Sequence, residues 1–250
     1  SVGGADEMLR GSEFLPTQGL QTVLADPREL DVRHDELVYK DTTIDLVYRD
    51  FSLQEIISIE KHGGQVHAMK HAFRHNQVVS TLAGEFDHKS LLELCSNPAF
   101  DRYFTAAQRR AFRTFIPWTR LMWERKTTDP EGHDEDLPAY VRTHREQLVL
   151  KPNRAYGGQD VVIGLDTTQA QWEEVMTGAL AQPPTWVVQE HVPLPQVEFF
   201  NPHDSHNPIE FVTVGFIATS EGIAFVGRSS TEHVVNISRG GSLVPMFLIR

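Results

Sequence analysis

The stretch Leu148-Val149-Leu150-Lys151-Pro152-Asn153-Arg154-Ala155-Tyr156-Gly157-Gly158-Gln159-Asp160 joins a short apolar run to a turn with two adjacent glycines. An apolar run of this length, bounded by turn residues, is typical of a buried strand. Lys151 stands at the end of this expected strand. A lysine in that position is either an edge residue whose stem lies on apolar surface or a fixed cation that faces a ligand.

The paired glycines Gly157 and Gly158 lack a Cβ atom, so a bulky anion can approach the backbone closely at this turn. Successive peptide N–H groups in such a turn form a concave donor site for phosphate. The ammonium group of Lys151 would add charge-assisted hydrogen bonds from a second side. The pattern Lys-Pro-x-x-x-x-Gly-Gly therefore indicates a phosphate site, with a plain hairpin turn as the alternative. It differs from the P-loop, in which Gly-Lys-Ser/Thr opens a helix.

Regular elements are expected on the carboxyl side of this turn. Val161–Gly164 predicts a second strand, and Thr168–Leu180 carries apolar side chains at helical spacing. Trp186–Glu190 predicts a third strand. Phe211–Ala218 and Ile223–Val226 flank a glycine-containing turn and predict a hairpin.

The amino-terminal half predicts further strands and helices. Apolar runs that end in charged or turn residues indicate strands, and apolar side chains at helical spacing, one set of them after the N-cap residue Ser52, indicate helices. The expected strands are Thr22–Ala25 and Ile44–Tyr48, and the expected helices are Ser52–Lys61, Lys89–Cys95 and Ala106–Phe115. Strands and helices mixed in this way predict an α/β (α+β) fold.

The chain is expected to have three segments. Residues 1–20 lack an amphipathic pattern and are expected to be disordered or a cloning remnant. Residues 21–145 are expected to form an α/β domain with a mobile acidic loop at 127–136. Residues 146–250 are expected to form a second region that contains the glycine turn.

The composition is typical of a soluble protein: 250 residues, of which 40% are hydrophobic and 23% charged. A formal net charge of −11, without a basic stripe, argues against nucleic acid as the main partner. No apolar stretch approaches the roughly 20 residues that a membrane span needs, and no secretory leader is evident. Cys95 has no second cysteine with which to form a disulfide. A cytoplasmic location is therefore expected.

Residues 149–160 resemble the lysine and glycine-rich loop of circularly permuted ATP-grasp ligases, a group that includes eukaryotic-type glutathione synthetase and relatives of glutathionylspermidine synthase. Other segments resemble, in the family's order, the early strand ends, a lysine that touches ATP phosphate, the linker strand that holds adenine, and the region that closes over substrate and nucleotide. These segments are 26–30, 44–49, 87–89, 187–191 and 227–241. The resemblance runs from Gln21 to Arg250. It implies a circularly permuted ATP-grasp fold, with residues 21–145 on the substrate side and 146–250 binding the nucleotide.

The resemblance implies an ATP-dependent ligase that phosphorylates a carboxylate and lets an amine, or rarely a thiol, attack the acyl phosphate. The partners would be small-molecule carboxylate and amine substrates, with ATP and Mg²⁺ as cofactors. The resemblance assigns ATP binding to Lys89, Lys151, Gly157, Gly158, Gln159, Gln189, Glu190 and His191. Val187 and Val188 would pack against the adenine face. The resemblance assigns catalysis to Lys151 and Arg228, and it assigns binding of the substrate carboxylate to Arg49 and Arg228. The lysines and the glycine backbone would offset the repulsion between carboxylate and triphosphate.

Several of these residues also have a plain structural interpretation. Lys89 can be a solvent-facing helix lysine, and Glu190 can be a surface strand residue with only its backbone in use. Arg228 can pair with an acidic neighbour such as Glu232. Asn236, in the segment expected to close over the nucleotide, can be a turn residue.

The sequence leaves the magnesium ligands unassigned. Magnesium takes oxygen ligands, normally carboxylates shared with substrate phosphates. The Glu-x-Asn pair of the permuted relatives does not occur in residues 1–49, and another family ligand would fall near Thr213, which is not acidic. The nearest oxygen donors are Glu198, Glu210 and Asn236. Two interpretations follow: a partial chain that lacks amino-terminal strands, or a non-catalytic nucleotide- or partner-binding module that has lost its metal ligands.

His67, His71 and His75 follow one another at intervals of four residues. On a helix they would share one face, and a metal-dependent hydrolase built on them is a third interpretation. Val66–Met69 fits a strand equally well, which would scatter the three rings, and the family resemblance favours that strand.

Overall fold

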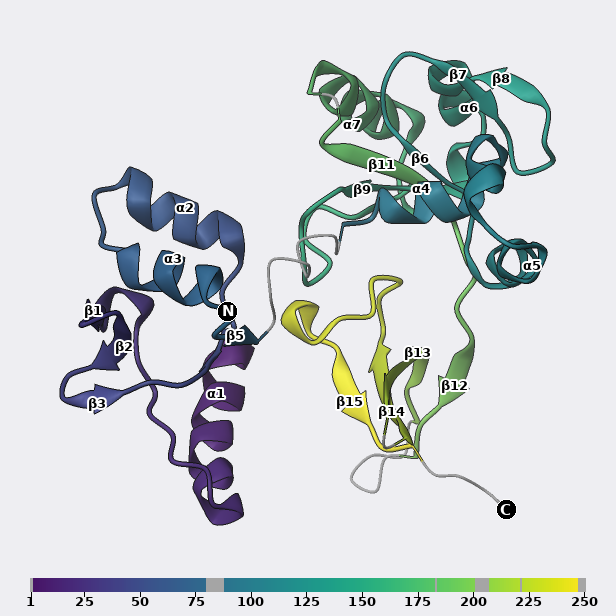
Figure 1. The fold of residues 1–250 in the computed structure, drawn as a ribbon. Helices are drawn as coiled ribbons and strands as arrows, with labels where there is room; N and C mark the ends of the chain where they lie inside the picture. The colour runs from purple at the N-terminus through teal and green to yellow at the C-terminus, as the bar shows by residue number, and fades with distance from the viewer. Residues whose placement is uncertain (1, 80–87, 183, 201–206, 221, 247–250) are drawn as a thin grey trace. The chain divides into compact units, whose positions relative to one another are not determined.

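The computed structural model describes residues 2–79, 88–182, 184–200, 207–220 and 222–246 (Figure 1). The chain divides into two units, Ser1–Asp87 and His88–Arg250. Both units combine helices with sheets, so the fold is mixed α/β. Residues 88–145, expected to pack with the residues before them, instead belong to the second unit, because β6 (Thr119–Leu121) pairs with β11 (Trp186–Glu190).

The amino-terminal unit holds the helices α1 (Val2–Phe14), α2 (Leu53–Lys61) and α3 (His67–Arg74). One antiparallel sheet has the strand order β1-β2-β3, and β4 pairs with β5 in parallel. The strands are β1 (Leu30–Arg33), β2 (Glu36–Tyr39), β3 (Thr42–Thr43), β4 (Val47–Tyr48) and β5 (Val78–Val79). Short 3-10 helices occupy Leu15–Gln18 and Pro27–Glu29.

The core of this unit forms where α2 and α3 pack with β1, β2 and β5. Its buried members are Leu30, Leu37, Ile56, Val66, Ala68, Met69, Ala72 and Val78. Ser52 caps α2 as predicted, since its Oγ accepts a hydrogen bond from the Glu55 N–H at 3.3 Å.

Three local expectations for this unit differ from the structure. Residues 2–14, expected to be disordered, form α1. Residues 22–25, expected to form a strand, have no regular secondary structure, and the side chains of Val23 and Leu24 are exposed, so burial does not stabilise a strand there. The favoured strand at 66–69 is instead the start of helix α3, whose apolar face enters the core through Ala68, Met69 and Ala72.

The carboxy-terminal unit starts with α4 (Leu91–Ser96) and α5 (Ala106–Phe115), close to the two helices predicted there. Its first sheet is antiparallel with the order β10-β9-β11-β6. Besides β6 and β11 it contains β9 (Leu148–Pro152) and β10 (Val162–Ile163), and the helices α6 (Leu137–Thr143) and α7 (Gln169–Ala181) pack on it (Figure 1). The predicted strands 148–152 and 186–190 and the predicted helix after Thr168 are therefore confirmed.

A single large core joins this sheet to α6 and α7. Its buried members are Trp118, Met122, Leu137, Tyr140, Val141, Leu148, Leu150, Trp172, Met176, Ala179 and Val188. Trp172 is fully buried at its centre, and its indole N–H donates to the carbonyl of Val141 at 2.9 Å. Burial of each large apolar side chain contributes about 1.5–3 kcal/mol, so this sheet is rigidly backed on its α6–α7 side.

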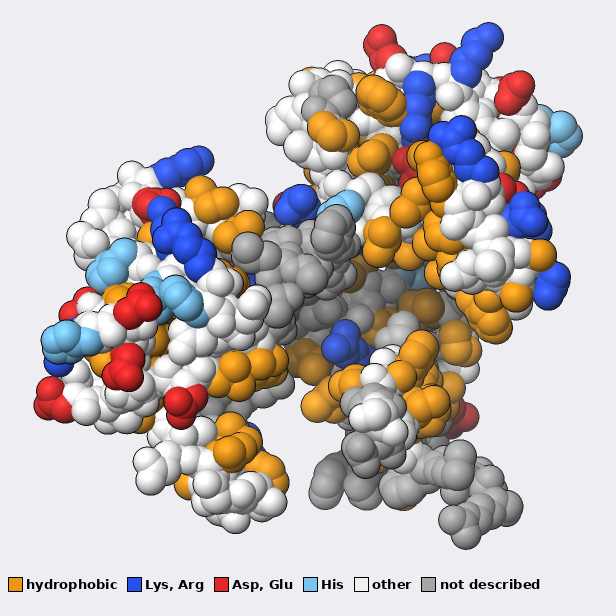
Figure 2. Space-filling view, viewed as in Figure 1, with side chains coloured by type: hydrophobic (Ala, Val, Ile, Leu, Met, Phe, Trp, Pro, Cys, Tyr) orange, Lys and Arg blue, Asp and Glu red, His pale blue; other side chains and the backbone are white. Residues whose placement is uncertain are grey.

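A second antiparallel sheet has the order β12-β13-β14-β15. Its strands are β12 (Gln196–Glu198), β13 (Ile209–Thr219), β14 (Gly222–Ser230) and β15 (Ser242–Val244). The predicted hairpin is β13–β14; its turn includes residue 221, which lies outside the described residues. Figure 2 shows apolar side chains on the surface of this sheet. Phe216 of β13 and Phe225 of β14 are exposed.

Residues 127–136 were expected to be a mobile loop. They instead form most of a hairpin, β7 (Lys126–Thr128) with β8 (Asp134–Asp136). Asp129 closes its turn by accepting the His133 N–H at 2.8 Å. Further 3-10 helices lie at Pro98–Tyr103, Arg145–Gln147, Gly164–Asp166 and Ile237–Arg239. Among the described residues, every helix is too short or too polar to cross a bilayer.

Candidate functional site

Lys151 lies on β9, on the sheet face opposite Leu150, which belongs to the core. Alternate strand residues share a face, and so do cross-strand partners; the register therefore places Lys151 on the same face as Gln189 of β11 and Thr119 of β6. Lys151 Nζ donates to Gln189 Oε1 at 2.6 Å, and Gln189 Nε2 donates to Thr119 Oγ1 at 2.8 Å. A polar row thus crosses the middle of a sheet whose other face is apolar.

The electrostatic environment of Lys151 disfavours its charge. Burial, and then the nearby charge of Lys89, lower the pKa of Lys151 to about 8. Among the described residues, no carboxylate lies within ion-pair distance of the Lys151 ammonium. A buried lysine beside a second lysine would be stabilised by an added anion.

Lys89 holds the glycine turn from the side of α4. Its Nζ donates to the Ala155 carbonyl at 2.6 Å, and its backbone N–H donates to the Asn153 carbonyl at 3.1 Å. The side chain of Asn153 in turn accepts the Ser90 N–H at 2.9 Å. Lys89 is therefore not a solvent-facing helix lysine but part of the turn's support. Asp87, in the same resembling segment, lies outside the described residues.

The glycine turn itself uses backbone conformations that favour glycine. Gly157 and Gly158 have φ angles of 66° and 75°, in the left-handed region. A Cβ atom on Gly158 would lie 2.7 Å from Val234 Cγ1 and 3.2 Å from Arg239 Cδ. Arg239 Nη1 also donates to the Gly158 carbonyl at 3.1 Å. The structure thus brings the turn against residues 234–239, two segments that the sequence separates by more than 70 positions.

Gln159 has a smaller role in this geometry than expected. Its backbone N–H donates to the Tyr156 carbonyl at 3.1 Å, which closes the turn, and its side chain is exposed. A phosphate at the turn would therefore meet the N–H of Gln159 only if this bond opened.

The groups of β11 that were expected to bond to adenine make hydrogen bonds within the protein. The side chain of Gln189 is buried and already bonded on both sides to Lys151 and Thr119. The backbone N–H groups of Glu190 and His191 donate to the carbonyls of Trp118 and Gln147, both at 2.8 Å. A base at this strand would have to bond to carbonyl oxygens, because the N–H groups serve the fold.

The expected contact of adenine with Val187 and Val188 would require the base to reach both side chains. Val188 belongs to the apolar core under α7 and is fully buried, so it has no face for a ligand. Val187 lies on the opposite face of β11, beside Lys151, and is fully buried too.

Two residues near this site were not predicted. His233 Nδ1 lies 2.8 Å from Asp166 Oδ2, and its ring makes an edge contact with that of His191 at a centroid distance of 6.2 Å. Burial lowers the pKa of His191, and the nearby charges of His233 and Lys151 lower it further. These three side chains therefore interact electrostatically. Asp166 and His233 are 67 positions apart, and no local sequence pattern links them.

The two arginines expected to bind the substrate carboxylate lie in other parts of the structure. Arg228 lies on β14 opposite Thr213 and is exposed. Arg49 belongs to the amino-terminal unit, where its Nη1 donates to the Phe51 carbonyl at 2.6 Å and its guanidinium lies 5.7 Å from the Phe73 ring centroid.

Among the described residues, no group of three or more carboxylate, histidine or cysteine ligands lies at the glycine turn. The one group with metal-ligand spacing in the described part of the chain lies in the amino-terminal unit. Of the oxygen donors considered from the sequence, Glu198 accepts a hydrogen bond from Asn207 Nδ2 at 2.8 Å, and Glu210 lies opposite Val197 on β13.

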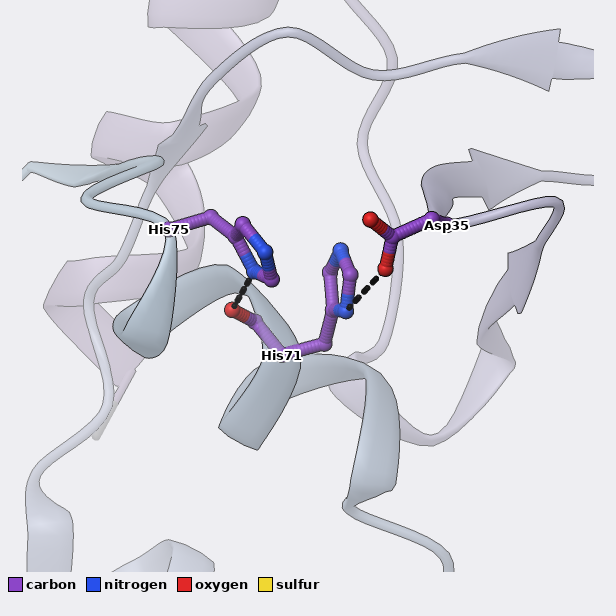
Figure 3. A group of neighbouring side chains, drawn as sticks. All are labelled: Asp35, His71 and His75. Carbon is purple, nitrogen blue, oxygen red and sulfur yellow. Dashed lines mark hydrogen bonds and ion pairs between the residues drawn. The ribbon is translucent and has the colours of Figure 1, made fainter.

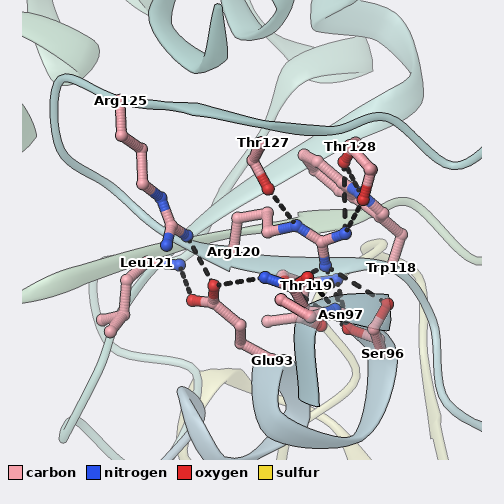
Figure 4. Close-up of polar contacts among 11 residues, drawn as sticks. Glu93, Ser96, Asn97, Trp118, Thr119, Arg120, Leu121, Arg125, Thr127 and Thr128 are labelled. Carbon is pink, nitrogen blue, oxygen red and sulfur yellow. Dashed lines mark hydrogen bonds and ion pairs between the residues drawn. The ribbon is translucent and has the colours of Figure 1, made fainter. Parts of the chain in front are cut away.

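A second group of buried polar side chains, around Arg120 of β6, is structural (Figure 4). Arg120 is fully buried, and its guanidinium donates to Thr127 Oγ1 at 2.8 Å and to Thr128 Oγ1 at 2.9 Å. Glu93 Oε1 and Oε2 accept from Arg125 Nη2 and the Leu121 N–H, both at 2.7 Å. Burial lowers the pKa of Arg120 to about 10, so it stays charged at neutral pH.

Comparison with known proteins adds no assignment: no protein-family model matches the chain, and no curated protein sequence matches it significantly.

Proposed function

We propose that the carboxy-terminal unit binds the phosphates of ATP at the glycine turn and that the protein is an ATP-dependent carboxylate–amine ligase of the circularly permuted ATP-grasp type. The observation that carries this proposal is that Lys89, whose Nζ donates to the Ala155 carbonyl of the turn with two left-handed glycines, also lies close to Lys151. Phosphate oxygens would offset the repulsion between the two ammonium groups and occupy Lys151 donors that the fold does not use.

The arrangement of the unit supports the nucleotide part of the proposal. Lys151 belongs to an antiparallel sheet backed by a helix, and the strand beside it, β11, leads on to a second antiparallel sheet. The turn after Lys151 contacts residues 234–239, which follow the second sheet's long hairpin. This order of parts agrees with the family resemblance of residues 149–160, 187–191 and 227–241.

The reaction proposed needs a carboxylate to approach a triphosphate. ATP would supply the phosphoryl group that activates the carboxylate. Lys151 and Lys89 would hold the phosphates and offset the repulsion between the two anions. Arg228, a planar cation on β14, is the candidate for the substrate carboxylate.

When the amine attacks the acyl phosphate, the C–N bond forms, the C–O bond to the phosphate breaks and inorganic phosphate leaves. The amine also loses a proton in this step, so a proton acceptor is required. His233 fits this role, because Asp166 holds its Nδ1 at 2.8 Å and leaves Nε2 as the acceptor nitrogen of the neutral ring. Its position beside His191, whose pKa Lys151 helps to lower, puts the acceptor close to the lysine site.

A second candidate function is a nucleotide-binding module without catalysis. The observation that favours it is that the described residues bring no group of three carboxylate or histidine ligands to the glycine turn. Such a module would bind ATP through the same lysines but would not release phosphate.

Thermal unfolding in the presence of ATP tests the binding step. At about 100 times its dissociation constant, ATP would raise the free energy of unfolding by roughly 2.7 kcal/mol. We expect this shift in the natural protein and in the control Lys126→Met, an exposed lysine on β7, but not in Lys151→Met. An equal shift in all three proteins would show that Lys151 does not hold the nucleotide.

Phosphate release distinguishes the two candidate functions. The protein is incubated with ATP, Mg²⁺ and panels of amino acids and short peptides, and inorganic phosphate is measured. Release that depends on a carboxylate and an amine together supports the ligase. Binding of ATP without release of phosphate, whichever carboxylate and amine are added, supports the non-catalytic module.

A further inference from the structure

Three potential metal ligands meet in the amino-terminal unit: Asp35, His71 and His75 (Figure 3). One ligand atom of each residue lies within 4.8 Å of those of the other two. His71 and His75 come from α3 and its carboxyl end, whereas Asp35 comes from the turn between β1 and β2. The group is therefore built by tertiary packing and not by one segment.

The position of Asp35 is fixed by a tight turn. Arg33 pairs with Glu36, so His34 and Asp35 form a two-residue hairpin loop. Both have positive φ angles, 52° and 68°, as a type I′ turn requires, and aspartate tolerates this conformation better than most residues. Since α3 packs on β1 and β2, the carboxylate reaches 3.8 Å from His71 Nδ1.

The ring of His75 is oriented as a metal ligand would be. His75 Nδ1 lies 3.0 Å from the carbonyl oxygen of His71 and donates to it in the neutral tautomer. Nε2 is then the nitrogen that carries the lone pair. Histidine ligands in proteins usually donate their other ring N–H to a carbonyl or carboxylate in this way. The two rings stack with centroids 4.0 Å apart, so both present their edges to the same space.

We infer that Asp35, His71 and His75 bind a divalent late first-row transition-metal ion of the Zn²⁺ class. Two imidazole nitrogens and one carboxylate oxygen form a donor set that such ions prefer over the all-oxygen sets of Mg²⁺ and Ca²⁺. Tetrahedral ligands of zinc lie about 3.4 Å apart, so the group must close slightly. The exposed Asp35 side chain can move for this, and water can fill the open position.

The surroundings of the group agree with a cation. Asp31 lies on β1, two residues before its end, and Figure 2 shows acidic side chains among the histidines on this surface. Asp31 Oδ1 lies 3.1 Å from His67 Nε2. His67 precedes His71 by one turn of α3. This second pair lacks a third ligand, because the described residues contain only one group with metal-ligand spacing. It therefore provides an internal control.

The test titrates untagged, chelator-treated full-length protein with Zn²⁺ by calorimetry and with Co²⁺ by visible absorption. We expect one ion per chain and Co²⁺ bands typical of a nitrogen- and oxygen-ligated site. His75→Ala is expected to weaken Zn²⁺ binding by at least about 100-fold, beyond the roughly 10–100-fold that loss of an outer partner costs. His67→Ala is expected to bind as the natural protein does.

Asp35→Asn tests the carboxylate without disturbing the turn, because asparagine also tolerates a positive φ angle. We expect it to weaken Zn²⁺ binding, with a circular dichroism spectrum equal to that of the natural protein. Equal Zn²⁺ affinity in Asp35→Asn, equal affinity in His75→Ala and His67→Ala, or no binding by the natural protein would each overturn the inference.

Discussion

Arg120 and Lys151 are two cations of the same sheet, Arg120 fully buried and Lys151 partly buried, and their surroundings differ in kind. Arg120 donates to threonine and backbone oxygens from all three guanidinium nitrogens, and Glu93 lies close enough to raise its pKa against the effect of burial. Among the described residues, the Lys151 ammonium donates to one side chain, Gln189, and the charge that perturbs it is another cation, Lys89.

The difference separates a structural cation from a functional one. A buried charge whose donors are all used by the fold is already stabilised and has no use for a ligand. A buried ammonium has three donors, and at Lys151 the described contacts of the fold occupy one of them. Both positions carry a charge that is at least partly withdrawn from water, so the number of unused donors is the better indicator of a binding site.

The largest effect is expected where the structural network is cut. Glu93→Ala removes the acceptor of Arg125 Nη2 and of the Leu121 N–H, and leaves the charges of Arg125 and Arg120 uncompensated in the interior. We expect the free energy of unfolding to fall by about 3–5 kcal/mol, as for other broken buried pairs. Urea denaturation measures this. The control Glu146→Ala, whose exposed carboxylate pairs with Arg145 Nη2, should cost at most about 1 kcal/mol.

Gly158→Ala tests whether the turn beside Lys151 is rigid. The added Cβ would meet Val234 Cγ1 at 2.7 Å, and alanine resists a φ angle of 75°, so we expect a loss of about 1–3 kcal/mol in unfolding free energy. The matched change Gly178→Ala, inside α7 with no atom within 4 Å of the new Cβ, should stabilise by roughly 0.5–1 kcal/mol. Equal effects of the two substitutions on urea denaturation would mean that the turn is free to rearrange.

Lys151→Met should change stability little, in contrast to Glu93→Ala. The substitution removes a disfavoured buried charge, a gain, but leaves Gln189 Oε1 without its donor, a loss of about 1–3 kcal/mol. These opposing terms are of similar size. Urea denaturation of the variant would contradict this contrast if it lost as much stability as Glu93→Ala.

The smallest expected effect is a proton linkage at Lys151. Its folded pKa of about 8 lies below the ordinary value of 10.5, so the unfolded chain holds more protons between these values and stability rises with pH across that window. A bound phosphate would raise the pKa again, and binding at pH 8 should therefore take up about half a proton. Calorimetry of ATP binding in buffers with different ionisation enthalpies measures this uptake, which Lys151→Met should abolish.

The sequence predicted those parts of the carboxy-terminal unit that local signals specify. The runs at 148–152 and 186–190 are apolar and bounded by turn residues, and Thr168 caps α7 by accepting the Gln171 N–H. The left-handed glycines of the turn after Lys151 were also indicated, because Gly157 and Gly158 are adjacent in the chain. In these cases the relevant interactions span few residues.

What the sequence could not predict depends on distant contacts. His233 meets Asp166, and Gly158 meets Val234, only because the second sheet returns to the first. The side chain of Gln189 is an available donor by type, but its partners Lys151 and Thr119 lie on other strands. At residues 66–69 the local sequence fits a strand and a helix equally well. The helix forms because it packs Ala68, Met69 and Ala72 into the core.

The burial of Trp172 has a practical consequence for experiments on this chain. All four tryptophans, Trp118, Trp123, Trp172 and Trp186, belong to the carboxy-terminal unit. Indole emission therefore reports the melting of that unit alone, whereas circular dichroism reports both units. Recording both signals from one sample shows whether the two halves melt together or in succession, because coincident curves are the mark of a single cooperative transition.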